Sequence, residues 1–273
     1  MTTYFKDGAE FTVNSETVAS PLPSGFTQGG QIAPTVTTLA DGRFIVSWTA
    51  TIDTQDGSGS AIKAQLFSSD GEKIGVEFLV NFATLNSQSQ PAVTALSGGG
   101  FVISWSTSDP TQDGSGNAVK AQVYDASGAA VAGEFLVNTQ ASGTQSSPEL
   151  TALSSGGFVA TWTSNASGDE DIKAQIFSAT GATVGTEFRV NNTTTGAQSA
   201  SDVTTLSNGN FIVTWSDSAN GGDIRARLFS STGTALTTDI QVHGSSTGVA
   251  AEGQRPLVHP PTESAPLGCF PAG

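Results

Sequence analysis

The stretch Phe101-Val-Ile-Ser-Trp105 occurs four times along this chain with small changes, and it decides the fold. Each copy begins with phenylalanine and ends in one of the four tryptophans of the sequence. The copies are Phe44-Ile-Val-Ser-Trp48, Phe101-Val-Ile-Ser-Trp105, Phe158-Val-Ala-Thr-Trp162 and Phe211-Ile-Val-Thr-Trp215, with the tryptophans 57, 57 and 53 residues apart. A fixed period outweighs local signals, because each unit can bury its apolar faces only against its neighbours. The sequence therefore predicts a repeat architecture.

Each repeat reads as four short strands, and the second repeat shows the plan. Its predicted strands are Pro91 to Leu96, Phe101 to Trp105, Val119 to Tyr124 and Glu134 to Asn138. Alternating apolar residues and β-branched or aromatic enrichment indicate strands, and glycine with Asp, Asn or Ser indicates the turns between them. No stretch shows the 3.6-residue apolar period of a helix.

Four antiparallel strands in up-and-down order are typical of a β-propeller blade. A parallel β-helix has shorter coils, and an immunoglobulin-like array needs about seven strands per unit. In the second strand, Phe101, Ile103 and Trp105 project to one face while Val102 and Ser104 face the next blade, so that both faces are buried. We therefore expect an all-β fold, a β-propeller of four-stranded antiparallel blades with four complete blade repeats.

The repeat divides the chain into six segments. Residues 1–33 hold a copy of the fourth strand, Glu10-Phe-Thr-Val-Asn14, and a linker. The blade repeats are 34–81, 91–138, 148–191 and 202–243. At 244–273 the pattern breaks, and we expect a truncated or foreign, disordered tail, although Gln254-Arg-Pro-Leu-Val258 echoes the opening of a repeat. Five fourth strands against four complete repeats leave three possibilities open: four closed blades, part of a five-bladed ring, or a homo-oligomer that completes a larger ring.

The composition excludes several classes of partner. The sequence holds 24 Asp and Glu against 10 Lys and Arg, a net charge of -14. Such a charge repels nucleic acid and anionic membranes and favours cations or cationic partners. No apolar run approaches the roughly 20 residues of a membrane span, so we expect no membrane insertion. The first residues carry no export signal of the charged-then-apolar type, and the single cysteine, Cys269, excludes a disulfide framework.

Acidic, glycine-rich loops follow the tryptophan strands and are the candidate metal sites. Calcium takes six to eight oxygens from carboxylates and carbonyls, and glycine lets the backbone turn carbonyls inward. The candidate ligands are Asp53, Asp56, Asp109, Asp113, Asp169, Asp171, Asp217 and Asp223. Calcium is the expected ion and zinc the weaker alternative. Plain hairpin turns, which Asp and Gly also make, are the competing interpretation.

Longer polar connections between blades emerge on the same rim as these loops. A polar rim around a central opening suits a small polar ligand, a carbohydrate or a cell-surface partner, whereas polar loops can also be merely solvated. The candidate rim residues are Gln88, Gln90, Gln145 and Gln198. The recurring Glu and Asn of the Glu-Phe-x-Val-Asn strands are interpreted as turn caps or blade-to-blade hydrogen bonds. The recurring Lys and Gln of the third strand suit an outward-facing ladder.

The combination of Gly-Gly-Phe-Val-x-x-Trp, Asp-Gly-Ser-Gly, Ala-Gln-x-Phe and Gly-x-Glu-Phe-x-Val-Asn resembles tandem repeats of large secreted bacterial proteins of the RTX and adhesin type. The resemblance covers about residues 8 to 243. It implies an extracellular, calcium-linked array, secreted or on the bacterial surface, and it transfers no catalytic residue. The nonapeptide Gly-Gly-x-Gly-x-Asp repeats of RTX tracts are absent.

These observations support functions of different classes. The leading hypothesis is a calcium-stabilised extracellular binding or adhesion module that recognises a polar ligand through its loop rim. The alternative is a metal-dependent hydrolase of the phosphotriesterase or lactonase type, in which a metal polarises the substrate oxygen. Its candidate carboxylates are Asp53, Asp109, Asp169 and Asp223. A third possibility is a rigid spacer without a ligand.

Overall fold

The computed structural model describes residues 10–14, 30–51, 59–219 and 222–243. Within these ranges sixteen β-strands form four antiparallel sheets of four strands each, and the strands of every sheet follow their order in the sequence. The prediction of an all-β propeller with four-stranded antiparallel blades is confirmed. In the same ranges, no helix is long and apolar enough to span a membrane. The predicted tail at 244–273 lies outside the described residues.

The strand bounds repeat from sheet to sheet. The first sheet contains β1 (Gln31–Thr38), β2 (Phe44–Ala50), β3 (Ala61–Phe67) and β4 (Lys73–Leu79). The second contains β5 (Gln88–Ala95), β6 (Phe101–Thr107), β7 (Ala118–Tyr124) and β8 (Phe135–Leu136). The third contains β9 (Gln145–Ala152), β10 (Phe158–Ser167), β11 (Asp169–Phe177) and β12 (Thr183–Arg189). The fourth contains β13 (Gln198–Thr205), β14 (Phe211–Asp217), β15 (Asp223–Phe229) and β16 (Ile240–His243).

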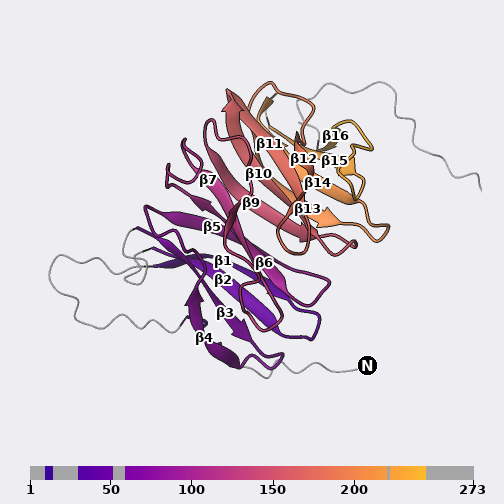
Figure 1. The fold of residues 1–273 in the computed structure, drawn as a ribbon. Coiled ribbons are helices and arrows are strands. Elements are labelled where there is room, and N and C mark those ends of the chain that lie inside the picture. Colours follow the sequence, from indigo (N-terminus) through magenta and orange to yellow (C-terminus); the bar gives the residue numbers. More distant parts are fainter. Residues whose placement is uncertain (1–9, 15–29, 52–58, 220–221, 244–273) are drawn as a thin grey trace, which may run out of the picture.

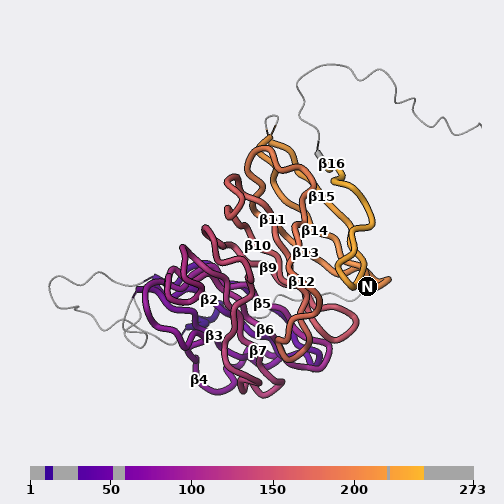
Figure 2. The backbone as a smooth tube through the Cα atoms, turned by 45° about the horizontal axis from the view of Figure 1, so that its top comes forward, coloured from indigo at the N-terminus to yellow at the C-terminus, as the bar shows by residue number. Residues whose placement is uncertain are grey.

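The four sheets stand face to face in an arc. The first strands β1, β5, β9 and β13 contact one another in turn along the inner side of the arc. Figures 1 and 2 show the sheets succeeding one another from β1–β4 to β13–β16. Over the described ranges, the first and last sheets make no extensive strand-to-strand contact, so the arc is open at its two ends.

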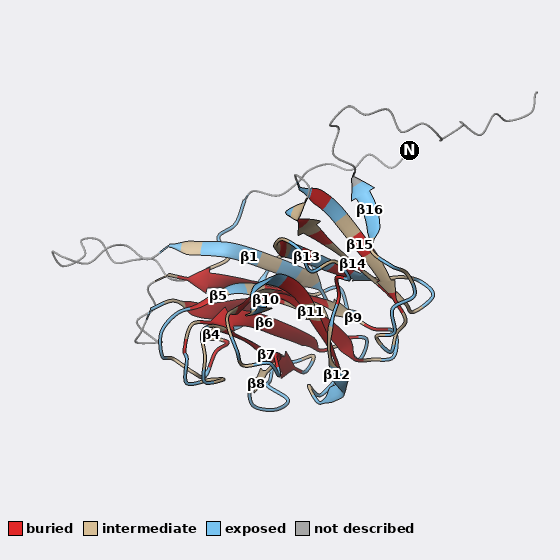
Figure 3. Cartoon of the chain, turned by 90° about the horizontal axis from the view of Figure 1, so that it is seen from above, coloured by how far each residue is buried: buried red, intermediate tan, exposed pale blue. Residues whose placement is uncertain are grey.

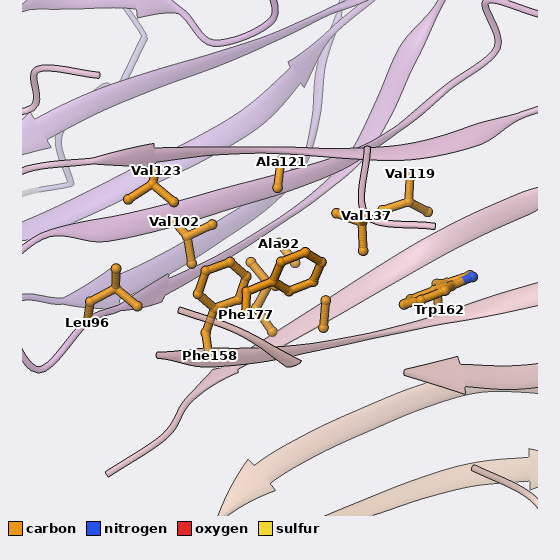
Figure 4. Close-up of a cluster of buried hydrophobic side chains, with 12 residues drawn as sticks. Ala92, Leu96, Val102, Val119, Ala121, Val123, Val137, Phe158, Trp162 and Phe177 are labelled. Atoms are coloured by element: carbon orange, nitrogen blue, oxygen red, sulfur yellow. The ribbon is translucent and has the colours of Figure 1, made fainter. Parts of the chain in front are cut away.

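A cluster of buried apolar side chains lies at each interface between sheets. Between the second and third sheets, Val102 and Val119 pack on Phe158, Trp162 and Phe177, and all five are buried (Figure 4). Phe158 stacks on Phe177 across the β10–β11 pair with ring centroids 5.1 Å apart. Burying one such side chain stabilises the fold by about 1.5–3 kcal/mol. The Phe-x-x-x-Trp repeat therefore supplies aromatic side chains of this buried layer.

Two of the third-strand lysines, Lys63 and Lys120, are buried and Lys173 is half-buried, which corrects the expectation of an outward-facing ladder. Lys63 and Gln65 are each 1% exposed, and β3 lies between β2 and β4 in its sheet. A buried ammonium needs a partner. Lys63 finds it in Glu77 at 3.2 Å, and Lys120 pairs with Glu134 in the same way.

The recurring Glu and Asn tie consecutive blades together, as predicted. Glu134 accepts hydrogen bonds from the backbone N–H groups of Phe82 and Ala83, 2.7 and 3.2 Å away, where the preceding blade has ended. Asn138 accepts from the Val119 N–H within its own sheet, at 2.9 Å. One carboxylate thus serves an ion pair with Lys120 and two backbone donors of another blade.

Glu134→Ala should destabilise the protein by about 3–5 kcal/mol, because it leaves a buried lysine and two backbone donors without their acceptor. Glu72→Ala is the matched control, since Glu72 is exposed and its substitution should stay within about 0.5 kcal/mol. Denaturant unfolding monitored by tryptophan fluorescence measures both. Equal stabilities of the two variants would contradict the role of Glu134.

Candidate functional site

Every first strand carries a β-bulge at the same position of the repeat. The bulged residues have positive φ without being glycine: Ala33 at 50°, Gln90 at 56°, Ser147 at 53° and Ala200 at 52°. The pairing register shifts at each of them. A left-handed non-glycine residue costs on the order of 1 kcal/mol, and a bulge re-aims the side chains beside it. Because the first strands contact one another, the bulges of neighbouring blades are brought together.

Three of these bulges line one open pocket of about 310 Å³ on the inner side of the arc, here called the axial pocket. Its walls come from β1, β5 and β9. They consist of Ala33, Pro34, Thr35, Gln90, Pro91, Ser147, Pro148 and Glu149. Prolines and polar groups therefore share the lining, with one carboxyl group among them.

Gln90 and Ser147 are held in place by hydrogen bonds across two blades. The Gln90 amide donates to the Ser147 hydroxyl at 3.1 Å, and its carbonyl accepts from the Ser106 hydroxyl at 3.1 Å. The Ser147 N–H donates to the Ser106 hydroxyl, also at 3.1 Å. Of the predicted rim residues, Gln90 thus lies on the axial pocket, in a fixed orientation.

Glu149 is the titratable group of the axial pocket. Desolvation by the surrounding protein, and then the negative charge of Asp202, raise its pKa to about 7, although Glu149 is an exposed residue whose side chain meets solvent at the pocket mouth. Asp202 lies at the equivalent position of β13, next to β9 in the arc. A carboxyl group with a pKa near neutrality can either donate or accept a proton at physiological pH.

The other three predicted rim residues do not face a rim. Gln88, Gln145 and Gln198 are each 0% exposed. Asn138 donates to the Gln145 side-chain carbonyl at 3.4 Å, and Asn191 to that of Gln198 at 3.1 Å. Gln145 and Gln198 therefore take part in buried hydrogen bonds at the junctions between blades. The bulge two residues later turns Gln90, and not Gln88, toward the axial pocket.

The predicted metal ligands of the second blade are engaged within the chain. Asp109 accepts from the Thr111 N–H at 2.9 Å, the Thr111 hydroxyl at 2.7 Å and the Gln112 amide at 2.7 Å. Burial acts to raise the pKa of Asp109, but these hydrogen bonds outweigh it and hold the pKa below its ordinary value. Asp113 accepts from Asn138 at 3.0 Å.

The third blade uses its acidic residues in the same way. Asp171 is buried and accepts from Asn191 and from the Ser167 hydroxyl, each at 2.7 Å. Asp169 accepts from the Gly196 N–H at 3.2 Å. Both carboxylates therefore brace loops of the rim.

In the fourth blade an arginine side chain occupies the position between the two aspartates that were predicted to bind a metal ion. Asp217 and Asp223 are buried partners across the β14–β15 pair, and Arg225 reaches them at 3.2 and 3.1 Å. Asp53 and Asp56 lie outside the described residues. Within the described ranges, no three His, Cys, Asp or Glu side chains come together as a metal-binding group. Calcium binding stays a prediction.

The chain is similar to solved structures, but it matches no known protein family. No protein-family model and no curated protein matches the sequence. A protein of unknown function from Dyadobacter fermentans DSM 18053 matches with a TM-score of 0.58 and 10% identity, over 78% of this chain and 69% of that one. Two further matches have a TM-score of 0.55. They are the α-L-arabinofuranosidase of Fusarium graminearum with an iminosugar inhibitor (12% identity, 77% of this chain, 66% of that one) and the α-L-arabinanase of Penicillium chrysogenum with arabinobiose (14%, 79%, 67%). At these identities the likeness shows the fold alone.

The raised pKa of Glu149 predicts a distinct pH dependence. Because the folded state holds this proton more tightly than an ordinary glutamate, the Glu149 contribution to stability is complete below pH ~4.5 and is lost as the pH rises through about 7. Asp202→Asn should lower the pKa of Glu149 while leaving it above its ordinary value, since burial is the larger cause.

Carboxyl-carbon NMR titration of Glu149 in the wild type, in D202N and in a Glu72→Gln control measures this shift. A Glu149 that titrates near pH 4.5, or a titration that D202N leaves unmoved, would contradict the assignment.

Proposed function

We propose that this chain is a carbohydrate-binding propeller module whose ligand occupies the axial pocket. The observation that carries the proposal is the convergence of Gln90, Ser147 and Glu149 on a proline-lined pocket at the inner side of the blades. The names of two structurally similar proteins add support, since an arabinofuranosidase and an arabinanase with arabinobiose share this fold.

The chemistry of the pocket suits a neutral sugar. A sugar hydroxyl both donates and accepts, and so do the Gln90 amide and the Ser147 hydroxyl; a protonated Glu149 does the same. Pro91 and Pro148 offer apolar surface to the C–H groups of a sugar ring. The net charge of -14 disfavours acidic saccharides.

A glycoside hydrolase is the second candidate, because Glu149 has a pKa near 7 and a second carboxyl group, Asp202, lies on β13, which contacts β9. Glycosidases use one protonated and one ionised carboxyl group on either side of the scissile bond. The pKa of Glu149 near 7 suits the acid, and the Asp202 carboxylate lies on the neighbouring strand. This candidate replaces the phosphotriesterase or lactonase alternative, for which the described aspartates offer no shared metal site.

Calcium stabilisation and an extracellular location remain parts of the proposal that rest on the repeat resemblance. The loop that contains Asp109 and Asp113 has the Asp-Gly pattern, although both carboxylates are already hydrogen-bonded within the chain. Sugar binding at the axial pocket does not depend on either part.

One experiment separates these possibilities. Arabinobiose and a panel of neutral disaccharides are titrated by calorimetry, and a chromogenic arabinofuranoside is assayed, each with calcium and with EDTA. Gln90→Ala should weaken binding at least tenfold, because it removes a hydrogen-bonding amide; Glu149→Gln should weaken it less but abolish any turnover. Glu72→Gln serves as the control.

The outcomes discriminate between the candidates. Binding without turnover supports the module, and turnover lost in E149Q supports the hydrolase. A melting temperature that EDTA leaves unchanged removes calcium from the proposal. No binding of any sugar, or binding that Q90A leaves intact, would overturn the axial pocket as the site.

A further inference from the structure

The outer face of the last sheet has no sheet packed on it among the described residues. In the first three blades the equivalent residues Ile62, Val119 and Ile172 are each 0% exposed, because the next sheet covers them. Their counterpart in the fourth blade, Ile224, is 42% exposed, and Val242 is 60% exposed. Figure 3 shows β16 as an exposed strand at this end of the arc.

The first sheet presents the complementary half of the same interface. Val36 is 62% exposed, whereas its counterpart Leu150 in the third blade is nearly covered. Figure 3 shows β1 largely exposed while the inner sheets are buried. An apolar pocket of about 160 Å³ opens beside Val46 and Trp48, where strands of a preceding sheet would lie. The two ends of the arc thus carry the front and the back of one repeated contact.

The N-terminal segment Glu10–Asn14 already fills one strand position of the missing sheet. The Phe11 ring lies 5.6 Å from that of Phe67, tilted by 50°. Phe78 meets Tyr124 in the next blade at 5.5 Å and 57°, so the two contacts are equivalent. Phe11 therefore takes the place that the fourth-strand residue of a preceding blade takes elsewhere in the arc.

We propose that a second copy of this chain docks its last sheet on the exposed face of the first sheet, head to tail. The occupant follows from continuity with the three internal interfaces, since Ile224 and Val242 are the residues that such a face receives. Docking would place Ile240 of the second copy where Phe11 lies, because both hold the same position of the repeat. The N-terminal segment is thus an internal competitor that restrains association.

The net charge of the chain affects self-association, so the salt concentration of the measurement matters. Each copy carries a net charge of -14, so like-charge repulsion opposes docking and added salt weakens that repulsion. A head-to-tail contact uses two different surfaces of the chain. A change at either surface alone should therefore block self-association, and two chains altered at opposite ends should still pair once.

Sedimentation velocity over a concentration series at raised salt tests this prediction. The wild type should associate with increasing concentration, and Val36→Asp or Val242→Asp should each weaken association at least tenfold. An equimolar mixture of V36D and V242D should form a one-to-one dimer and nothing larger, because each retains one intact face. Val76→Asp is the control, since it adds the same charge at an 82% exposed position of β4, the outermost strand of the first sheet.

Phe11→Ala should strengthen association by weakening the competitor. A protein that stays monomeric at every concentration, F11A included, would overturn the proposal. A mixture of V36D and V242D that fails to pair would overturn it as well, and so would V76D if it weakened association equally. Pairing in the mixture also shows that both altered chains are folded.

Discussion

The structure depends on one constraint, which is that a twisted four-stranded sheet with two apolar faces can be buried only between two like sheets. Val102 and Trp105 lie on opposite faces of β6 and show this. Val102 packs toward the third sheet, and Trp105 packs toward the first. The aromatic stack of each β-strand pair then sets how closely the next sheet approaches. A content of 12% charged residues suits such an array, because inner strands such as β6 and β7 are buried along their whole length.

The recurring acidic residues of the fourth strands connect buried cations to the backbone of the preceding blade. Glu134 joins a buried lysine to the backbone of the preceding blade, and Glu187 repeats the arrangement through Thr139 and Gln140. In the last blade the role passes to Asp239, which accepts from the Asn192 N–H. Removing one partner of such a set costs more than the set contributes, so the motif constrains the repeat.

The strands and their grouping into blades could be predicted from the sequence, because alternation, turn residues and a fixed period are local signals. Burial of Lys63 could not be predicted, since it depends on β2 and β4, which flank β3 and place Trp48 and Glu77 beside this lysine. The axial pocket was missed for a related reason. It joins Gln90 to Glu149 from different blades, and the only local signal was an acidic residue after Pro148 where the first two repeats have Thr35 and Ala92.

The raised pKa of Glu149 likewise depends on Asp202, which lies one repeat further along the chain. The proposed site therefore lies where equivalent positions of neighbouring blades meet at the inner side of the arc. The acidic residues of the loops, in contrast, bind within their own loop or blade. Asp109 and Asp171 look alike in sequence, but each is engaged by donors of its own loop or blade.

The most direct test of the central claim is the free energy of unfolding of Trp162→Ala. Trp162 is fully buried between the second and third sheets, and its removal leaves a cavity in the layer that joins the two halves of the arc. The account predicts a single cooperative transition with a loss of about 3–5 kcal/mol, seen alike by backbone circular dichroism and by the remaining tryptophans. A loss within about 0.5 kcal/mol would contradict the claim that the blades are stable only through their shared faces.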